Sequence, residues 1–179
     1  MNKKINSILL SFLEIVTYIF SGIFAIATVG LIVIGLEKIF RVGTLYKEFI
    51  SDFISKSVDP GIKSTSMFSV LVLLISILVS IIIFFEITVF IRRIVKNLKH
   101  EIYFNFDNLK NIRWIMYSAA FFLILDVLSK IVFDIVHLNI FYTSWSEIFV
   151  SALVFLGIYV IYLVFKRGVE LQEDSDSLI

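Results

Sequence analysis

The sequence predicts an all-α polytopic membrane protein, a bundle of four transmembrane helices. Apolar residues make up 59% of the 179 residues, and the mean hydropathy of +0.99 lies well above the range of soluble domains. The apolar residues gather in four runs long enough to cross a bilayer, at about residues 8–36, 67–91, 114–138 and 148–165. We therefore expect a single membrane domain over residues 1–179.

The composition also limits the chemistry of the protein. There is no cysteine and there are only two histidines, so the chain offers no disulfide and too few ligands for a common zinc or haem site. A net charge of +1 argues against direct binding of nucleic acid. The sequence has no nucleophile, zinc-protease or phosphate-binding motif. We expect no enzyme, and no catalytic, cofactor-binding or metal-binding residue.

The first apolar run begins after Lys3 and Lys4, as a signal peptide would. It is much longer than the apolar core of a signal peptide and contains Glu14, so we expect it to remain as a helix. Polar and small residues at spacings of three and four form one face of this helix, which we expect to pack against a neighbour with Glu14 pointing into the bundle. These residues are Glu14, Thr17, Ser21, Ala25 and Thr28.

The longest segment outside the apolar runs follows, between the first two spans. Residues 38–57 carry a broad apolar face and a charged opposite face when placed on a helix. We expect an amphipathic helix on the extracytoplasmic side, lying in the headgroup region. The alternative is a lid that gates the bundle or binds a partner.

The second run ends at Arg92 and Arg93 and contains a second intramembrane acid, Glu86. Periodicity leaves two positions open for Glu86, because it could reach Glu14 or only meet the arginines at the end of its own span. If the two carboxylates met in a low-dielectric site, they would share a proton. In the alternative, each carboxylate pairs with a nearby cation such as Arg113.

The third run carries the charges Asp126, Lys130 and Asp134 at spacings of four, so they form one stripe on a helix. Charged groups at membrane depth usually face a protein interior. The stripe has three interpretations: a structural triad in which Lys130 bonds both carboxylates, a conduction or proton-relay element, or a polar socket for a lipid headgroup or another membrane protein. With Glu14 and Glu86, these three residues form the candidate intramembrane polar cluster.

The connector between the second and third runs, residues 92–113, has six basic and two acidic side chains. Its first part should continue the second helix. Asn105 or Asp107 is the expected N-cap of the next one, with Phe104 or Phe106 as the staple residue. The fourth helix should stop at residues 166–168, leaving residues 168–179 as a tail with four acidic residues. We expect this tail either to dock on the basic connector as a latch or to remain solvated while the connector contacts anionic lipid.

The distribution of cations predicts the orientation in the membrane. With both termini on one side, that side holds ten cations against five on the other, which places both termini in the cytoplasm of a multi-pass cell-membrane protein. The ten are Lys3, Lys4, Arg92, Arg93, Lys96, Lys99, Lys110, Arg113, Lys166 and Arg167.

Two stretches resemble a known family. The ending FKRGVELQEDSDSLI, from Phe165, resembles the RGxxLQxDxD signature that closes a bacterial four-span membrane family of unknown function. Asn97-Leu98 and residues 106–113 resemble that family's connector motif, without its usual Gly and Pro. The resemblance covers residues 67–179 and implies a four-span protein encoded beside a small helix-turn-helix regulator. The matching tail positions are Arg167, Gly168, Leu171, Gln172, Asp174 and Asp176.

Two functions compete at this level. The first is a regulatory, non-enzymatic membrane protein whose cytoplasmic connector and tail bind a partner, which the resemblance suggests is the helix-turn-helix regulator. The connector residues of this candidate site are Arg92, Arg93 and Arg113. The alternative is a small transporter, channel or immunity-type protein that uses the intramembrane carboxylates. Membrane lipid is an expected partner in either case, and self-association into a homo-oligomer stays open.

Overall fold

The computed structural model describes residues 3–40, 67–135 and 145–177. They form four helices: α1 (Lys3–Phe40), α3 (Met67–Lys99), α4 (Phe106–Ile135) and α5 (Trp145–Asp176). All four are long and apolar enough to cross a membrane, so the prediction of an all-α bundle of four helices of spanning length is confirmed. The expected amphipathic helix at residues 38–57 falls largely outside the described residues, since α1 covers only its first three positions.

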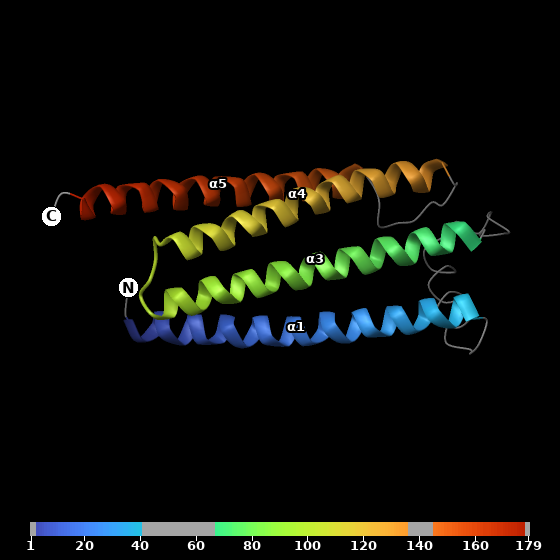
Figure 1. The fold of residues 1–179 in the computed structure, drawn as a ribbon, viewed down its shortest axis with the longest axis horizontal. Coiled ribbons are helices and arrows are strands. Elements are labelled where there is room, and N and C mark those ends of the chain that lie inside the picture. The colour runs from blue at the N-terminus through green and yellow to red at the C-terminus, as the bar shows by residue number, and fades with distance from the viewer. Residues whose placement is uncertain (1–2, 41–66, 136–144, 178–179) are drawn as a thin grey trace.

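The helices pack in chain order as an open bundle (Figure 1). Close backbone approach occurs between α1 and α3, between α3 and α4, and between α4 and α5, whereas α1 and α5 do not approach each other within 8 Å between Cα atoms of the described residues. The described ends of the chain and the loop of residues 100–105 lie at the same end of the bundle (Figure 1). We call this the connector end.

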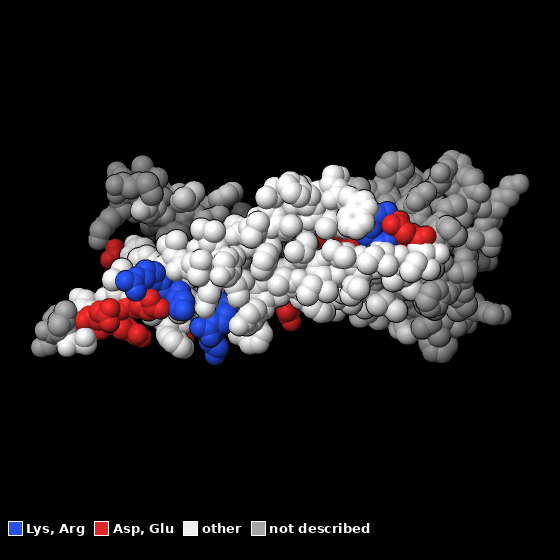
Figure 2. Space-filling view, turned by 90° about the horizontal axis from the view of Figure 1, so that it is seen from above, with Lys and Arg blue, Asp and Glu red and all other residues white. Residues whose placement is uncertain are grey.

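Packing is tightest toward the connector end. Most of the surface elsewhere is apolar and exposed, as expected where lipid takes the place of water. Figure 2 shows this as a largely white middle section, with charged side chains mainly toward the two ends. Among the described residues, five of the seven buried apolar side chains lie in the connector half: Val95, Leu109, Ile112, Ile115 and Val169.

The fourth helix does not end where the sequence suggested. Lys166, Arg167 and Gly168 were expected to stop it, but α5 continues without interruption to Asp176. A span needs only about 20 residues, and α5 has 32. Residues 168–176 are therefore a helical extension of the fourth span, and not an irregular tail. We call them the α5 extension.

Candidate functional site

Arg92 joins α3 to α1 at the connector end. Its guanidinium donates hydrogen bonds to the backbone carbonyl of Thr17, at 3.1 Å, and to the hydroxyl of Ser21. It also lies over the ring of Tyr18, 4.0 Å from the ring centre, which is a favourable cation–π position. Thr17 and Ser21 are buried as predicted, whereas Ala25 is exposed. The polar face of α1 is thus confirmed at the two residues that receive Arg92.

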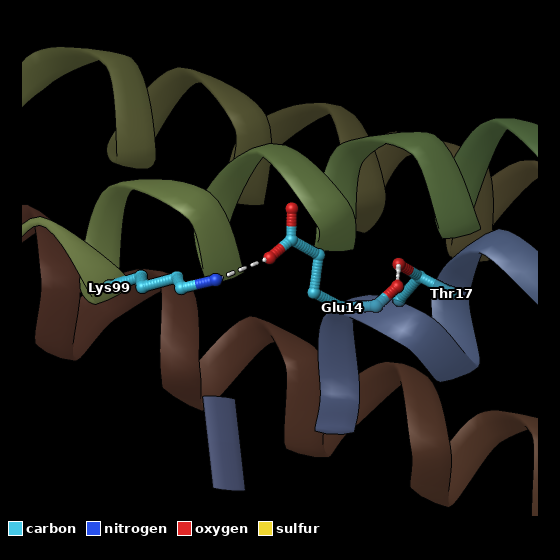
Figure 3. Close-up of polar contacts among 3 residues, drawn as sticks. All are labelled: Glu14, Thr17 and Lys99. Atoms are coloured by element: carbon cyan, nitrogen blue, oxygen red, sulfur yellow. Dashed lines mark hydrogen bonds and ion pairs between the residues drawn. The ribbon is translucent and has the colours of Figure 1, made fainter. Parts of the chain in front are cut away.

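Glu14 forms the second link between these helices (Figure 3). Its carboxylate lies 3.0 Å from the ammonium of Lys99 on α3, and both side chains are partly exposed. A partly exposed pair of this kind contributes up to about 1 kcal/mol. Glu14 therefore pairs with a cation of the connector, as one alternative expected, and this cation is Lys99. Arg113, the cation named for this role, lies instead 6.0 Å from the ring centre of Tyr162 on α5.

Glu86 does not join Glu14. It is exposed on α3 and lines a pocket between α3 and α4 together with Arg93, and it has no ion pair with any residue in the described ranges. Glu86 and Arg93 are seven positions apart, so they lie on one helix face about 10 Å apart. The two glutamates accordingly form no shared-proton site in this structure.

The charged stripe on α4 is divided between two partners. Lys130 pairs with Asp134 at 2.5 Å, as expected for positions four apart. The expected bond from Lys130 to Asp126 is absent among the described residues, and Asp126 accepts a hydrogen bond of 2.8 Å from the hydroxyl of Ser151 on α5. Asp126 is therefore a contact between helices, so the five residues of the predicted polar cluster do not converge on one site.

The loop between α3 and α4 begins with a tight helix ending. The amide of Ile102 donates to the carbonyl of Asn97, and the amide of Glu101 donates to the carbonyl of Leu98. This pair of bonds is a Schellman motif. Glu101 takes the left-handed position of the motif with φ of 61°, where glycine is usual. The chain thus reverses direction within six residues, 100–105.

Asn108 holds this loop from the inside. Its side chain is completely buried, accepts a hydrogen bond from Asn97 at 2.7 Å, and donates to the carbonyls of Ile102 and Tyr103 at 3.0 and 2.8 Å. Asn105 caps α4 by accepting from the backbone amide of Asn108 at 2.8 Å, which confirms the first of the two expected N-caps. One buried amide therefore satisfies groups from the end of α3, the loop and the start of α4.

The loop is also packed against α5. The ring of Phe104 lies 5.4 Å from the ring of Phe165, measured between centres. The same ring lies over Gly168, where a Cβ atom would overlap three atoms of the phenyl ring. Glycine is the residue that allows this close approach. The loop and the extension of α5 therefore form one packed unit.

Glu170, the first acidic residue of the α5 extension, is paired within its own helix. Glu170 forms ion pairs with Lys166 at 3.9 Å and Arg167 at 3.2 Å, and acidic side chains of the extension form a patch beside basic ones in Figure 2. No ion pair joins the extension to residues 92–113 within the part of the chain that is described. The contact expected as an electrostatic latch is made by apolar groups, Phe104, Phe165 and Gly168.

A family model described as "Protein of unknown function (DUF2975)" matches residues 56–179. This is more than two thirds of the 179 residues. The chain belongs to the DUF2975 family. No curated protein and no solved structure matches it. The match agrees with the four-span family of unknown function suggested by the connector and the C-terminal ending, and it extends 11 residues further toward the N-terminus than the resemblance at 67–179.

The tail positions that carried the DUF2975 resemblance have different environments. Gly168 is in contact with Phe104, and Arg167 pairs with Glu170. Leu171, Gln172 and Asp174 are exposed, and Asp176 is the last residue of α5. Gly168 of the signature thus belongs to the packed unit of loop and α5, whereas Leu171, Gln172 and Asp174 lie on the outer surface of the helix.

Two residues of this DUF2975 chain are central to the connector end. Asn108 was not singled out from the sequence, and Phe104 was named only as one of two candidate staple residues at the start of the third span. Asn108 has asparagine neighbours at 105 and 111. Asn105 caps α4, Asn108 is buried, and Asn111 lines a pocket, so the residue type alone did not show which of the three would hold the loop. Phe104 meets Gly168 through a contact across 64 positions, which helical periodicity does not reveal. The repeated asparagines at 105, 108 and 111 were the one available signal, because three amides at spacings of three share one side of a helix start.

Proposed function

We propose that this protein is a regulatory, non-enzymatic membrane protein whose connector end binds a cytosolic partner protein. The observation that carries the proposal is the continuation of α5 to Asp176. Its last turns are too polar for the bilayer, yet they present Leu171 with 54% of its surface exposed. A polar helix that projects beyond the bilayer offers its side chains, Leu171 among them, for contact with another protein.

The distribution of cations supports a cytosolic location for this surface. The count of ten cations against five favours an orientation with the connector end inside the cell. The loop is held by Asn108 and packed on α5 through Phe104, so a partner would meet a preformed surface and lose little ordering entropy on binding.

The acidic character of the extension favours a basic partner. Glu170, Glu173, Asp174 and Asp176 lie within seven residues. A DNA-binding domain carries a basic face, so the helix-turn-helix regulator implied by the family resemblance has complementary charge. Binding that face here would compete with DNA and hold the regulator at the membrane.

A direct binding assay tests this proposal. The full chain in nanodiscs is titrated with a helix-turn-helix regulator of the kind that the family resemblance implies, with and without operator DNA. We expect saturable binding, at least a tenfold loss when Leu171→Ser is combined with removal of residues 172–179, and competition by DNA. Asp134→Asn, at the opposite end, is the matched control. Equal affinity for the truncated and intact chains would contradict the proposal.

The transport alternative has less support. It requires the intramembrane carboxylates to line a common route, whereas Asp126 bonds Ser151, Glu14 pairs with Lys99, and Glu86 lies between α3 and α4. Replacing Asp126 by Asn and Lys130 by Gln separates the two functions, since a transporter loses flux and a regulator keeps its partner.

A further inference from the structure

A groove runs between α3 and α4 at the connector end. It consists of two adjoining pockets that share Phe90, Arg93 and Trp114. The polar pocket, of about 290 Å³, is completed by Asn97, Asp107, Lys110 and Asn111. The apolar pocket, of about 360 Å³, is completed by Phe85, Glu86 and Val89. We call the two together the α3–α4 groove.

The polar pocket is lined by two cations, of which Arg93 lies over the ring of Phe90, 5.4 Å from the ring centre. Arg93 and Lys110 are exposed and form no ion pair with any described residue. Asn111 is 8% exposed, and it lines the pocket. Asp107 is the one acidic residue lining this pocket. The charged side chains that line the pocket thus carry a net charge of +1.

The apolar pocket continues the groove toward the membrane centre. The rings of Phe90 and Trp114 are stacked, 6.3 Å apart and 8° from parallel. Trp114 is 48% exposed, and an exposed tryptophan is typical of the level where headgroups meet acyl chains. Glu86 lies about two turns deeper than Arg93, and its negative charge disfavours an anion at that depth. An anionic group is therefore directed to the Arg93 end.

We propose that the α3–α4 groove binds one anionic phospholipid of the phosphatidylglycerol type. Its phosphate lies between Arg93 and Lys110, its headgroup hydroxyls meet Asn111 and Asp107, and one acyl chain follows Phe90 and the apolar pocket. The single negative charge of the phosphate matches the net charge of the polar pocket, which a zwitterionic headgroup would leave unbalanced. Loss of partner binding at the α5 extension would leave this site unaffected.

Tryptophan quenching tests the proposal directly, because Trp114 lines both pockets and the chain has only two tryptophans. Trp145→Phe leaves Trp114 as the single fluorophore in the full chain. The protein is placed in phosphatidylcholine vesicles containing 5 mol% of either phosphatidylglycerol or phosphatidylcholine brominated near the headgroup end of its acyl chains. We expect at least threefold stronger quenching by brominated phosphatidylglycerol.

Two variants and one competitor define the outcome. Arg93→Gln with Lys110→Gln should make the two brominated lipids quench equally, while Lys96→Gln, an exposed cation outside the groove, should change nothing. Inorganic phosphate at 10 mM should not relieve quenching. Equal quenching by the two lipids in the unaltered groove overturns the proposal, whether or not the double variant folds. Relief by inorganic phosphate also overturns it, because the site would then be one for free anions.

Discussion

Phe104 of the α3–α4 loop lies against Gly168 of α5, in the space that any larger residue would need for its Cβ atom. This contact joins the loop to the helical extension of the fourth span. Asn108 secures the other side of the loop by bonding two of its carbonyls. The connector end is consequently a defined surface built from the ends of three helices.

Replacing Gly168 by alanine tests this packing. Gly→Ala within a helix usually stabilises by up to about 1 kcal/mol, but here the new methyl group must displace Phe104, and overpacking costs about 1–3 kcal/mol. We expect Gly168→Ala to lower the unfolding midpoint in an SDS titration. Gly157→Ala on the same helix, with nothing within 4 Å of its Cβ position, should not lower it. Adding Phe104→Ala to Gly168→Ala should restore part of the loss.

Asn108→Ala should destabilise the loop strongly. The change removes three hydrogen bonds. It leaves the side-chain amide of Asn97 and the backbone carbonyls of Ile102 and Tyr103 without their partner. The expected cost is about 1–3 kcal/mol, with faster amide hydrogen exchange in residues 100–105. Lys96→Ala, an exposed change on the preceding helix, serves as the control. Unchanged exchange in the loop would show that Asn108 does not hold it.

Arg92 and Arg93 are adjacent but should respond differently to the same change. Arg92→Gln removes the bonds to α1 and leaves the buried hydroxyl of Ser21 without its donor, so we expect a loss of about 1–3 kcal/mol. Arg93→Gln should alter stability by less than about 0.5 kcal/mol, since exposed substitutions rarely do more. SDS titrations of the two variants provide the comparison. Similar losses would mean that net charge, and not the contact with α1, stabilises this end.

Ser151→Ala tests the contact between α4 and α5. Asp126 would lose its hydrogen bond from α5, at a cost of about 1.5–3 kcal/mol for a bond to a charged group. Asp126→Asn should be milder, because the amide oxygen can still accept from Ser151. The ratio of the two losses is read from the same titration. A larger loss in Asp126→Asn would show that the charge, and not the bond, matters there.

Much of the fold could be predicted from composition and spacing. The four apolar runs defined four helices, and spacings of three and four identified Thr17 and Ser21 as buried on α1. The ends of the helices were harder to predict. Lys166, Arg167 and Gly168 resemble a helix C-terminus, but α5 continues past them to Asp176. Gly168 instead leaves room for Phe104, which comes from another part of the chain.

Charge pairing was only partly predictable, because spacing along one helix does not show what a neighbouring helix offers. Lys130 forms the expected ion pair with Asp134, whereas Asp126 accepts a hydrogen bond from Ser151 on α5. Arg92 and Arg93 looked alike at the end of the second span. They lie about 100° apart on the helix, so one faces α1 and the other faces the α3–α4 groove.

The most direct test of the connector end as one rigid unit is a distance measurement across it. The chain has no native cysteine, so Tyr103→Cys and Glu173→Cys, both at exposed positions, can carry a pair of spin labels in nanodiscs. Pulsed electron spin resonance should give one narrow distance distribution, which broadens when Asn108→Ala is added. A broad distribution in the protein without Asn108→Ala would contradict the packed unit formed by the loop and the α5 extension.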